Sequence, residues 1–519
     1  MTETTASDVL RSDYGGFNPR FIGLSYLFDS ADDYNMVHEY MTESEQLSKT
    51  GNADATLHRI ALLSVVDHEN RHYVDFLLSP YSMMVFRMRL QGLINAIQAL
   101  NVIRGIEGDV LPVPLSRWAT LTKSQRETRR ADWSDLFGRD IRPVSLPAWS
   151  RDDLVTNVAP TVESIAHLPD QREFERYAEA AIRAYLRIGQ LTEGFDVPET
   201  ALYLRPPYVH EVSALTVQLA AVWVGQGLAE FLRLSSFLLD SEAPQARAFQ
   251  LCFKLASLLE HETGGSGLDQ SLLLPLRRIL TITTWALFGN YQLDGARGCP
   301  SSRLIRLLDA VTEEPDDARL SCDLDDEASI ERMWHHWDER IGATPWGKSL
   351  AHNLAITSRG ASQYLRLRDI WQGSTDILDA VIGVLHQVEE HQQIIARTFV
   401  QDLRPIVDPF RYVRIPDSDL PRPDVRFEFR GFGAKPDWVR SGRMIQRRTS
   451  DGTPYAAGVA FAVRGDGGAW ALLDQKLTLE EQIEWCDVAF SELSVPDHVY
   501  PSARRGVEDL SGKRLVQLV

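Results

Sequence analysis

The sequence lacks the cysteine spacing of a disulfide framework or a cysteine-based zinc finger. Its 519 residues include four cysteines that are far apart and form no C-x-x-C pair. We therefore expect reduced thiols at Cys252, Cys299, Cys322 and Cys486. The N-terminal stretch also lacks a basic segment followed by an apolar one, so we predict no secretory signal and a cytoplasmic location.

Basic charge is scarce as well. The formal net charge is -18, whereas a general nucleic-acid binder needs a basic face that neutralises phosphates. We therefore predict no general nucleic-acid binding. A local group of arginines is interpreted as a solvated surface of the C-terminal region: Arg440, Arg443, Arg447 and Arg448.

No uninterrupted apolar run is long enough to suggest a membrane span. The best candidate, Val212 to Leu239, contains four polar or charged residues that a spanning helix tolerates poorly. These are Gln218, Gln226, Glu230 and Arg233. We therefore predict a buried core helix here and no membrane association. A fixed-period repeat is also missing, which argues against a solenoid.

Helical patterns are abundant, and 44% of the residues are hydrophobic. The sequence predicts a mainly α fold: a large multi-helical body and a small C-terminal β-containing unit. Alternating segments such as "DVRFEFRGF" and "AAGVAFAVRGDGGAWALLD" predict the strands of that unit. The expected divisions are an N-terminal region 1–106, an irregular connection 107–170, a helical body 171–406 and a C-terminal α+β unit 407–519.

A chemically distinctive motif lies in the N-terminal region. The stretch "LLSVVDHENRHYVDFLLSP" has a helical apolar period that Ser79-Pro80 should end. It carries His68 and His72, four residues apart, with Glu69 after the first. Residues four apart lie on one helix face, so both imidazoles can point at one divalent ion, and the glutamate can reach a metal-bound water.

This H-E-x-x-H arrangement resembles the zincin superfamily of zinc metallopeptidases, over about ten residues around His68 to His72. The resemblance implies Zn²⁺ as cofactor, the two histidines as ligands and Glu69 as general base. Arg71 departs from the family pattern, which usually has uncharged residues between the glutamate and the second histidine.

One zincin branch, the gluzincins, takes its third ligand from a glutamate on a later helix, often in an E-x-x-A setting. Glu211, with Ala214 three residues on, stands at the head of an apolar helix and is the first choice here. A carboxylate entering such a helix is costly to bury unless it is paired, and a metal is one such partner. Alternatively, Glu211 is a first-turn glutamate favoured by the helix dipole after two prolines.

Other third ligands stay open: His210, Glu260, Glu262, Glu389, Glu390 and His391. Each of them also fits a solvated helix face. Asp75 lies on the same face as His72, where it could accept the second imidazole N–H. It could equally pair with Arg71 at four-residue spacing.

Three functions follow from these observations. The leading hypothesis is a zinc-dependent hydrolase of the metallopeptidase type, with a peptide or protein substrate. The second is a di-iron or di-manganese oxidoreductase, because Glu69-x-x-His72 is also the half-motif of ferritin-like bundles, although no second E-x-x-H occurs. The third is a non-catalytic helical scaffold or partner-binding protein in which the histidines are packed or solvated.

Overall fold

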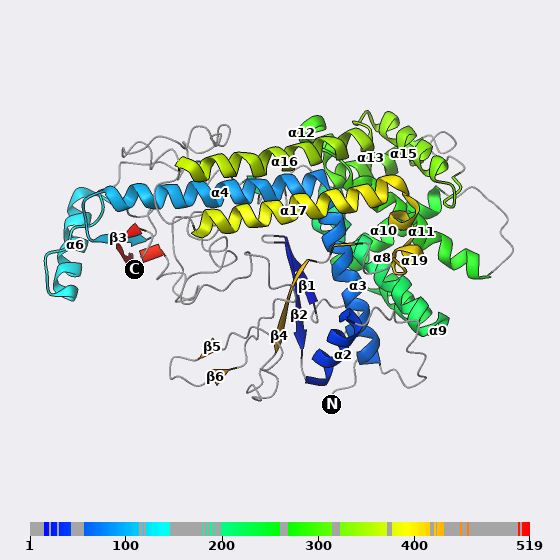
Figure 1. Cartoon of the computed structure of the whole chain (residues 1–519), viewed down its shortest axis with the longest axis horizontal. Coiled ribbons are helices and arrows are strands. Elements are labelled where there is room, and N and C mark those ends of the chain that lie inside the picture. Colours follow the sequence, from blue (N-terminus) through cyan, green and yellow to red (C-terminus); the bar gives the residue numbers. More distant parts are fainter. Residues whose placement is uncertain are drawn as a thin grey trace. The chain divides into compact units, whose positions relative to one another are not determined.

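The computed structural model shows a mainly α fold, as the sequence predicts (Figure 1). It describes residues 15–19, 22–28, 31–42, 57–113, 121–145, 199–259, 268–313, 322–370, 376–415, 423–429 and 511–518, with short pieces between these ranges. Two compact units can be distinguished, each assembled from distant segments of the sequence. Unit 1 comprises 1–83, 192–358 and 387–466, and unit 2 comprises 84–191, 359–386 and 467–519.

The helix that carries the H-E-x-x-H motif is α3 (Leu57–Leu78), which belongs to unit 1. It ends where the sequence predicts, and α4 (Pro80–Gly105) begins at the proline. Pro80 stands at the first position of α4, where its missing N–H costs no hydrogen bond and its fixed φ suits the helix. The N–H of Ser79 still donates to the carbonyl of Asp75 at 2.9 Å, so the helical hydrogen bonds of α3 continue through its last turn.

The apolar stretch after Pro206 forms two helices, so the prediction of one core helix from Val212 to Leu239 was wrong. They are α8 (Pro206–Gln226) and α9 (Leu228–Asp240). Gly227 separates them with φ 87, a backbone conformation that residues with a Cβ rarely adopt. Most of α8 is buried, whereas α9 buries one stripe. No helix among the described residues is long and apolar enough to cross a membrane.

The other helical elements of unit 1 surround α3 and α8. They are α2 (Ala31–Thr42), η5 (Glu199–Leu204), α10 (Pro244–Leu258), α11 (Leu268–Leu287), α12 (Tyr291–Asp294), η6 (Gly295–Gly298), α13 (Pro300–Glu313), α15 (Glu327–Ile341), α18 (Arg404–Val407) and α19 (Pro409–Tyr412). Two long helices, α16 (Trp346–Ile370) and α17 (Asp376–Gln401), contribute one end to each unit.

A three-stranded sheet in unit 1 has the order β1-β2-β4. Strand β1 (Gly15–Asn18) pairs antiparallel with β2 (Gly23–Phe28), and β4 (Asp424–Phe429) adds to β2 in parallel. The strand expected from "DVRFEFRGF" is thus present, and it joins a sheet with N-terminal strands. A short pair, β5 (Arg447–Arg448) with β6 (Pro454–Tyr455), follows it. The hairpin expected over 456–474 lies outside the described residues.

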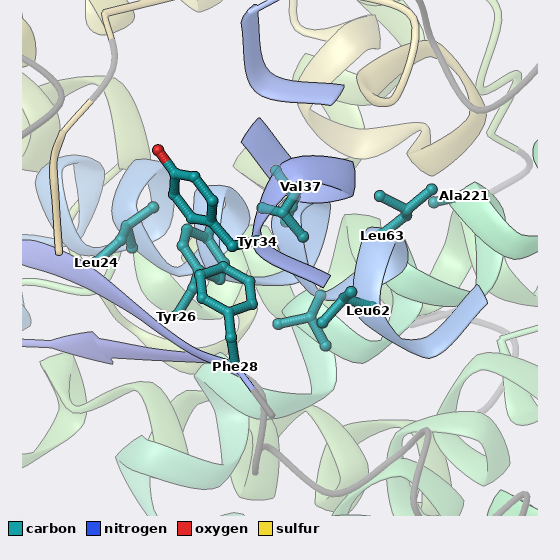
Figure 2. Close-up of a cluster of buried hydrophobic side chains, with 10 residues drawn as sticks. Leu24, Tyr26, Phe28, Tyr34, Val37, Leu62, Leu63 and Ala221 are labelled. Atoms are coloured by element: carbon teal, nitrogen blue, oxygen red, sulfur yellow. The ribbon is translucent and has the colours of Figure 1, made fainter. Parts of the chain in front are cut away.

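Buried side chains fasten this sheet to the motif helix. Figure 2 shows Phe28 of β2 beside Tyr34 of α2, whose rings meet edge to face at 5.8 Å. Leu62 and Leu63 of α3 belong to the same cluster, and so does Ala221 of α8. Because the cluster joins β2, α2, α3 and α8, it fixes the sheet against the two helices that matter for the site.

Unit 2 has its own core. Within it, α6 (Lys123–Phe137) begins with a capping box between Thr122 and Gln125, and Trp133 of α6 stacks on Trp118 at 5.4 Å. Strand β3 (Val110–Val113) pairs in parallel with β7 (Arg514–Gln517) from the end of the chain. The described strands after residue 407 form the expected C-terminal β-containing part, in which β4 pairs with β2 and β7 pairs with β3 from earlier in the chain.

Candidate metal centre

Three side chains from α3 and α8 converge in unit 1. The Nε2 atoms of His68 and His72 lie 3.1 Å apart. Nε2 of His68 lies 3.5 Å from Oε2 of Glu211, and Nε2 of His72 lies 3.4 Å from Oε1 of the same carboxylate. Both imidazoles are buried, whereas a third of the Glu211 side chain is exposed. The two imidazole nitrogens therefore face one carboxylate, each nitrogen next to a different oxygen of Glu211.

The dimensions of this triangle fit a zinc ion. Tetrahedral zinc with bonds of about 2.0–2.2 Å to nitrogen and oxygen places any two ligand atoms about 3.3–3.5 Å apart. The two nitrogens lie 3.1 Å apart, and the nearest carboxylate oxygen lies 3.4 Å from His72 and 3.5 Å from His68. Among the described residues this is the group of His, Cys, Asp and Glu that could hold a metal ion. Three protein ligands leave a fourth position for water or substrate, the pattern of catalytic zinc sites.

Charges at the centre attract one another strongly. Burial alone would lower the pKa of His72, but Glu211, Glu69 and Asp75 together outweigh it and raise that pKa to about 9. Burial would likewise raise the pKa of Glu211, but the two imidazoles outweigh it and hold that pKa far below its usual range. The centre therefore binds a positive charge, which is a proton on His72 when no metal is present.

Glu69 occupies a different environment from Glu211 although it adjoins His68. Its side chain is almost fully buried, and burial raises its pKa even though both imidazoles oppose the shift. A backbone hydrogen bond from Phe17 of β1 reaches its carboxylate. Its Oε2 atom has no hydrogen-bond partner among the residues that the structure describes. Glu69 thus combines a proton affinity above normal with an oxygen that is available to accept a proton.

Strand β1 covers this part of α3 closely. A Cβ added to Gly15 would lie 2.5 Å from Cγ1 of Val65 and 3.1 Å from Cγ of Glu69, so only glycine fits without a shift. The ring of Phe17 stacks on His72 with centroids 6.4 Å apart, and it meets Phe76 edge to face at 5.1 Å. β1 therefore supplies a backbone contact to Glu69 and an aromatic wall beside His72.

Arg71, the departure from the zincin pattern, is fully buried. Its guanidinium pairs with Asp75 at 2.9 Å, so of the two expectations for Asp75 the structure contains the pair with Arg71. Oδ2 of Asp75 has no hydrogen-bond partner within the described part of the chain, so no bond to His72 is made. The guanidinium also donates hydrogen bonds to three further acceptors: Ser213 Oγ, Thr284 Oγ1 and the carbonyl of Ile406.

Glu211 lies beyond the first turn of α8, which contains no acidic residue. The helix-dipole explanation for a first-turn glutamate therefore does not apply to it. Its neighbour His210 is partly buried, and Nε2 of His210 lies 2.8 Å from the hydroxyl of Ser82, while burial lowers the pKa of this imidazole to about 4. His210 is thus a neutral side chain that packs beside the centre, 6.5 Å from His72 between ring centroids.

The remaining rival ligands lie elsewhere. His391 interacts through Nδ1 with the hydroxyl of Tyr73, and Glu389 accepts a hydrogen bond from Gln393. Glu390 is exposed. Glu260 and Glu262 lie outside the described residues. The contact of Phe17 with Glu69 was not foreseen, and neither were the bonds of Arg71 to Ser213, Thr284 and Ile406. A charged residue in the middle of an apolar helix nevertheless signals buried partners.

Comparison with known proteins gives no further guide to this site. No protein family matches the chain, and no curated protein or solved structure is significantly similar to it. The function must therefore be argued from the geometry of the centre.

Proposed function

We propose that this chain is a zinc-dependent hydrolase of the metallopeptidase type, with His68, His72 and Glu211 as the metal ligands and Glu69 as the general base. The observation that carries the proposal is the convergence of two imidazole nitrogens, 3.1 Å apart, on one carboxylate, whose oxygens lie 3.4 and 3.5 Å from them, close to the ligand separations of tetrahedral zinc. The resemblance of the motif to zincins, and of the Glu211 setting to gluzincins, points to the same chemistry.

A zinc ion held there would polarise a substrate carbonyl and lower the pKa of a bound water toward about 7. The chain's own residues supply the proton transfers. Glu69 lies beside His68 on α3, and burial raises the pKa of its carboxyl group above the usual value. A general base works best when its pKa approaches the working pH, so this shift suits Glu69 to take a proton from water and pass it to the leaving amine.

Strand β1 favours an extended peptide as the substrate. It stands at one end of the sheet order β1-β2-β4 and pairs with β2 alone among the described strands. Gly15, Gly16 and Phe17 are only partly buried. An exposed strand edge can take up an extended chain through main-chain hydrogen bonds. Because Phe17 also contacts Glu69, a peptide along β1 would pass the general base.

The di-iron alternative finds less support. Glu69 accepts a backbone hydrogen bond from Phe17 and is not one of the three clustered ligands. The related pair Glu331 and His335 lies on the exposed surface of α15, where His335 contacts Glu339 at 3.2 Å. A two-metal centre needs a second set of carboxylates and histidines facing the first. Under the scaffold alternative the three groups would be an ion pair between protonated His72 and Glu211, and metal binding distinguishes the two.

The test is hydrolysis of a pool of unstructured peptides by purified zinc-loaded protein, read by mass spectrometry, for wild type and Glu69→Gln. Glu69→Gln should keep one zinc per chain and lose cleavage, because the glutamate moves protons and holds no metal. Glu331→Gln, on the exposed face of α15, should cleave like wild type. Equal cleavage by wild type and Glu69→Gln, or loss of zinc from Glu69→Gln, would overturn the assignment of the base.

A further inference from the structure

We infer that Arg71 is a positioning residue for the metal centre: through Ser213 it fixes the turn of α8 that carries Glu211. This inference rests on the proposed function. Arg71 lies between Glu69 and His72 on α3, and Ser213 follows Glu211 by two positions on α8. The hydrogen bond between Arg71 Nε and Ser213 Oγ, 3.0 Å long, therefore joins the two ligand-bearing segments directly.

The two contacts between these segments hold α8 from different sides. Residues two apart on a helix point about 200° apart around its axis, so Glu211 and Ser213 project in nearly opposite directions. One contact runs from the histidines to Glu211, at 3.4 and 3.5 Å, and the other runs from Arg71 to Ser213. Two polar contacts on different sides of α8 oppose small rotations of the helix about its axis more strongly than one contact would, in addition to the packing of its buried side chains.

The guanidinium itself is rigidly held. Any movement of the guanidinium would break buried hydrogen bonds. It is fully buried and bonds Asp75, Thr284 Oγ1 at 2.8 Å and the carbonyl of Ile406 at 2.9 Å. It also lies over the ring of Tyr412, 4.9 Å from its centroid. Planar guanidinium groups with several fixed acceptors have little freedom to reorient. Through Arg71, the position of Ser213 is thus fixed relative to α3, α11, α18 and α19.

The geometry also explains why a charged residue stands where zincins usually have an uncharged one. Glu211 is distant from the motif in sequence, and no short loop ties α8 to α3. The buried hydrogen bond from the charged Arg71 to Ser213 fixes the position of α8 relative to α3, which no short loop does. A lysine at position 71 could not make these bonds, because the four acceptors lie around a planar guanidinium with five N–H donors, whereas an ammonium group has three donors at one point.

The test compares two variants that each remove one hydroxyl from the same guanidinium. Ser213→Ala breaks the link to α8, whereas Thr284→Val breaks the link to α11, which carries no proposed ligand. Both hydroxyls are buried, so both variants should unfold at similarly lower urea concentration. Cobalt(II) substituted for zinc gives the affinity and, through its visible absorption, the symmetry of the site.

Ser213→Ala should lose cobalt and zinc affinity by roughly 10- to 100-fold, as outer partners of metal ligands do when removed, and should shift the cobalt spectrum. Thr284→Val should keep the wild-type affinity and spectrum. Equal affinities and spectra in the two variants would overturn the positioning role while leaving the metal site standing. A wild-type protein that binds neither metal would overturn the proposed function, and the positioning role with it.

Discussion

Oε1 of Glu211 lies 3.4 Å from Nε2 of His72, and Oε2 of the same carboxylate lies 3.5 Å from Nε2 of His68. One carboxylate from α8 thus faces both imidazoles of α3. Without a metal, the arrangement is an ion pair with a protonated His72. With a metal, the same three groups would share one divalent cation, so metal binding would exchange a proton for an ion.

The carboxylate of Glu211 should be needed for metal binding. Glu211→Ala should weaken zinc binding by more than about 100-fold, since losing a ligand should cost at least as much as losing a partner of a ligand. The control is Glu230→Ala on α9, where the side chain is 3.6 Å from Arg233 and faces no histidine of the centre. Isothermal titration of metal-free protein with zinc measures both. Equal zinc affinity in wild type and Glu211→Ala would refute Glu211 as a ligand.

The second histidine of the motif should be equally necessary. His72→Ala should bind no zinc at micromolar concentration, because it leaves one imidazole and one carboxylate at the centre. His335→Ala provides a matched control, since that imidazole is exposed on α15 and contacts Glu339 at 3.2 Å. Zinc content after dialysis gives the answer. Retention of one zinc per chain by His72→Ala would contradict the ligand set.

Metal affinity should rise with pH. The pKa of His72 in the metal-free protein is raised to about 9, so the imidazole is protonated at pH 7 and must release that proton to bind zinc. Affinity should therefore increase by up to about tenfold per pH unit from pH 7 to 9 and level off above it. Competition with a chelator of known pH dependence measures the trend, and a flat profile would be inconsistent with the charged pair.

The close approach of β1 should be sensitive to Gly15. In Gly15→Ala the new Cβ meets Val65 and Glu69 at 2.5 and 3.1 Å, so β1 must move away from the general base. We expect a loss of about 1–3 kcal/mol in the free energy of unfolding, as for other overpacked positions, and slower hydrolysis with zinc retained.

The control for this change is Gly16→Ala, whose Cβ would come no nearer than 3.5 Å to Ser25 Oγ. This variant should differ from wild type by no more than about 0.5 kcal/mol in unfolding free energy, as surface substitutions usually do. Urea unfolding and peptide hydrolysis give both quantities. Similar effects at Gly15 and Gly16 would show that contact with Glu69 is not what makes Gly15 special.

Local patterns explain what the sequence could predict. The apolar period before Pro80 located α3 and its end, because periodicity and proline act within a few residues. The resemblance of the Glu211 setting to gluzincins, together with the cost of burying a carboxylate, selected Glu211, which the structure brings to the histidines. The break at Gly227 was missed, because a single glycine inside an apolar helical pattern is often tolerated.

Long-range contacts explain what the sequence could not predict. Apart from Asp75, the partners of Arg71 lie 142, 213 and 335 positions away along the chain, so no local pattern indicates these three. Phe17 reaches the motif from a strand whose place is set by the core around Phe28 and Tyr34. Such contacts depend on the packing of whole elements, and a motif gives no information about them.

Zinc titration into metal-free wild-type protein, followed by elemental analysis after dialysis, tests the central claim most directly. The account predicts one zinc per chain that survives dialysis. Replacing any one of His68, His72 and Glu211 should remove this zinc. Two iron or manganese ions per chain would favour the oxidoreductase instead. A protein that retains no metal under these conditions would contradict the account, since its three converging ligands would then be an ion pair alone.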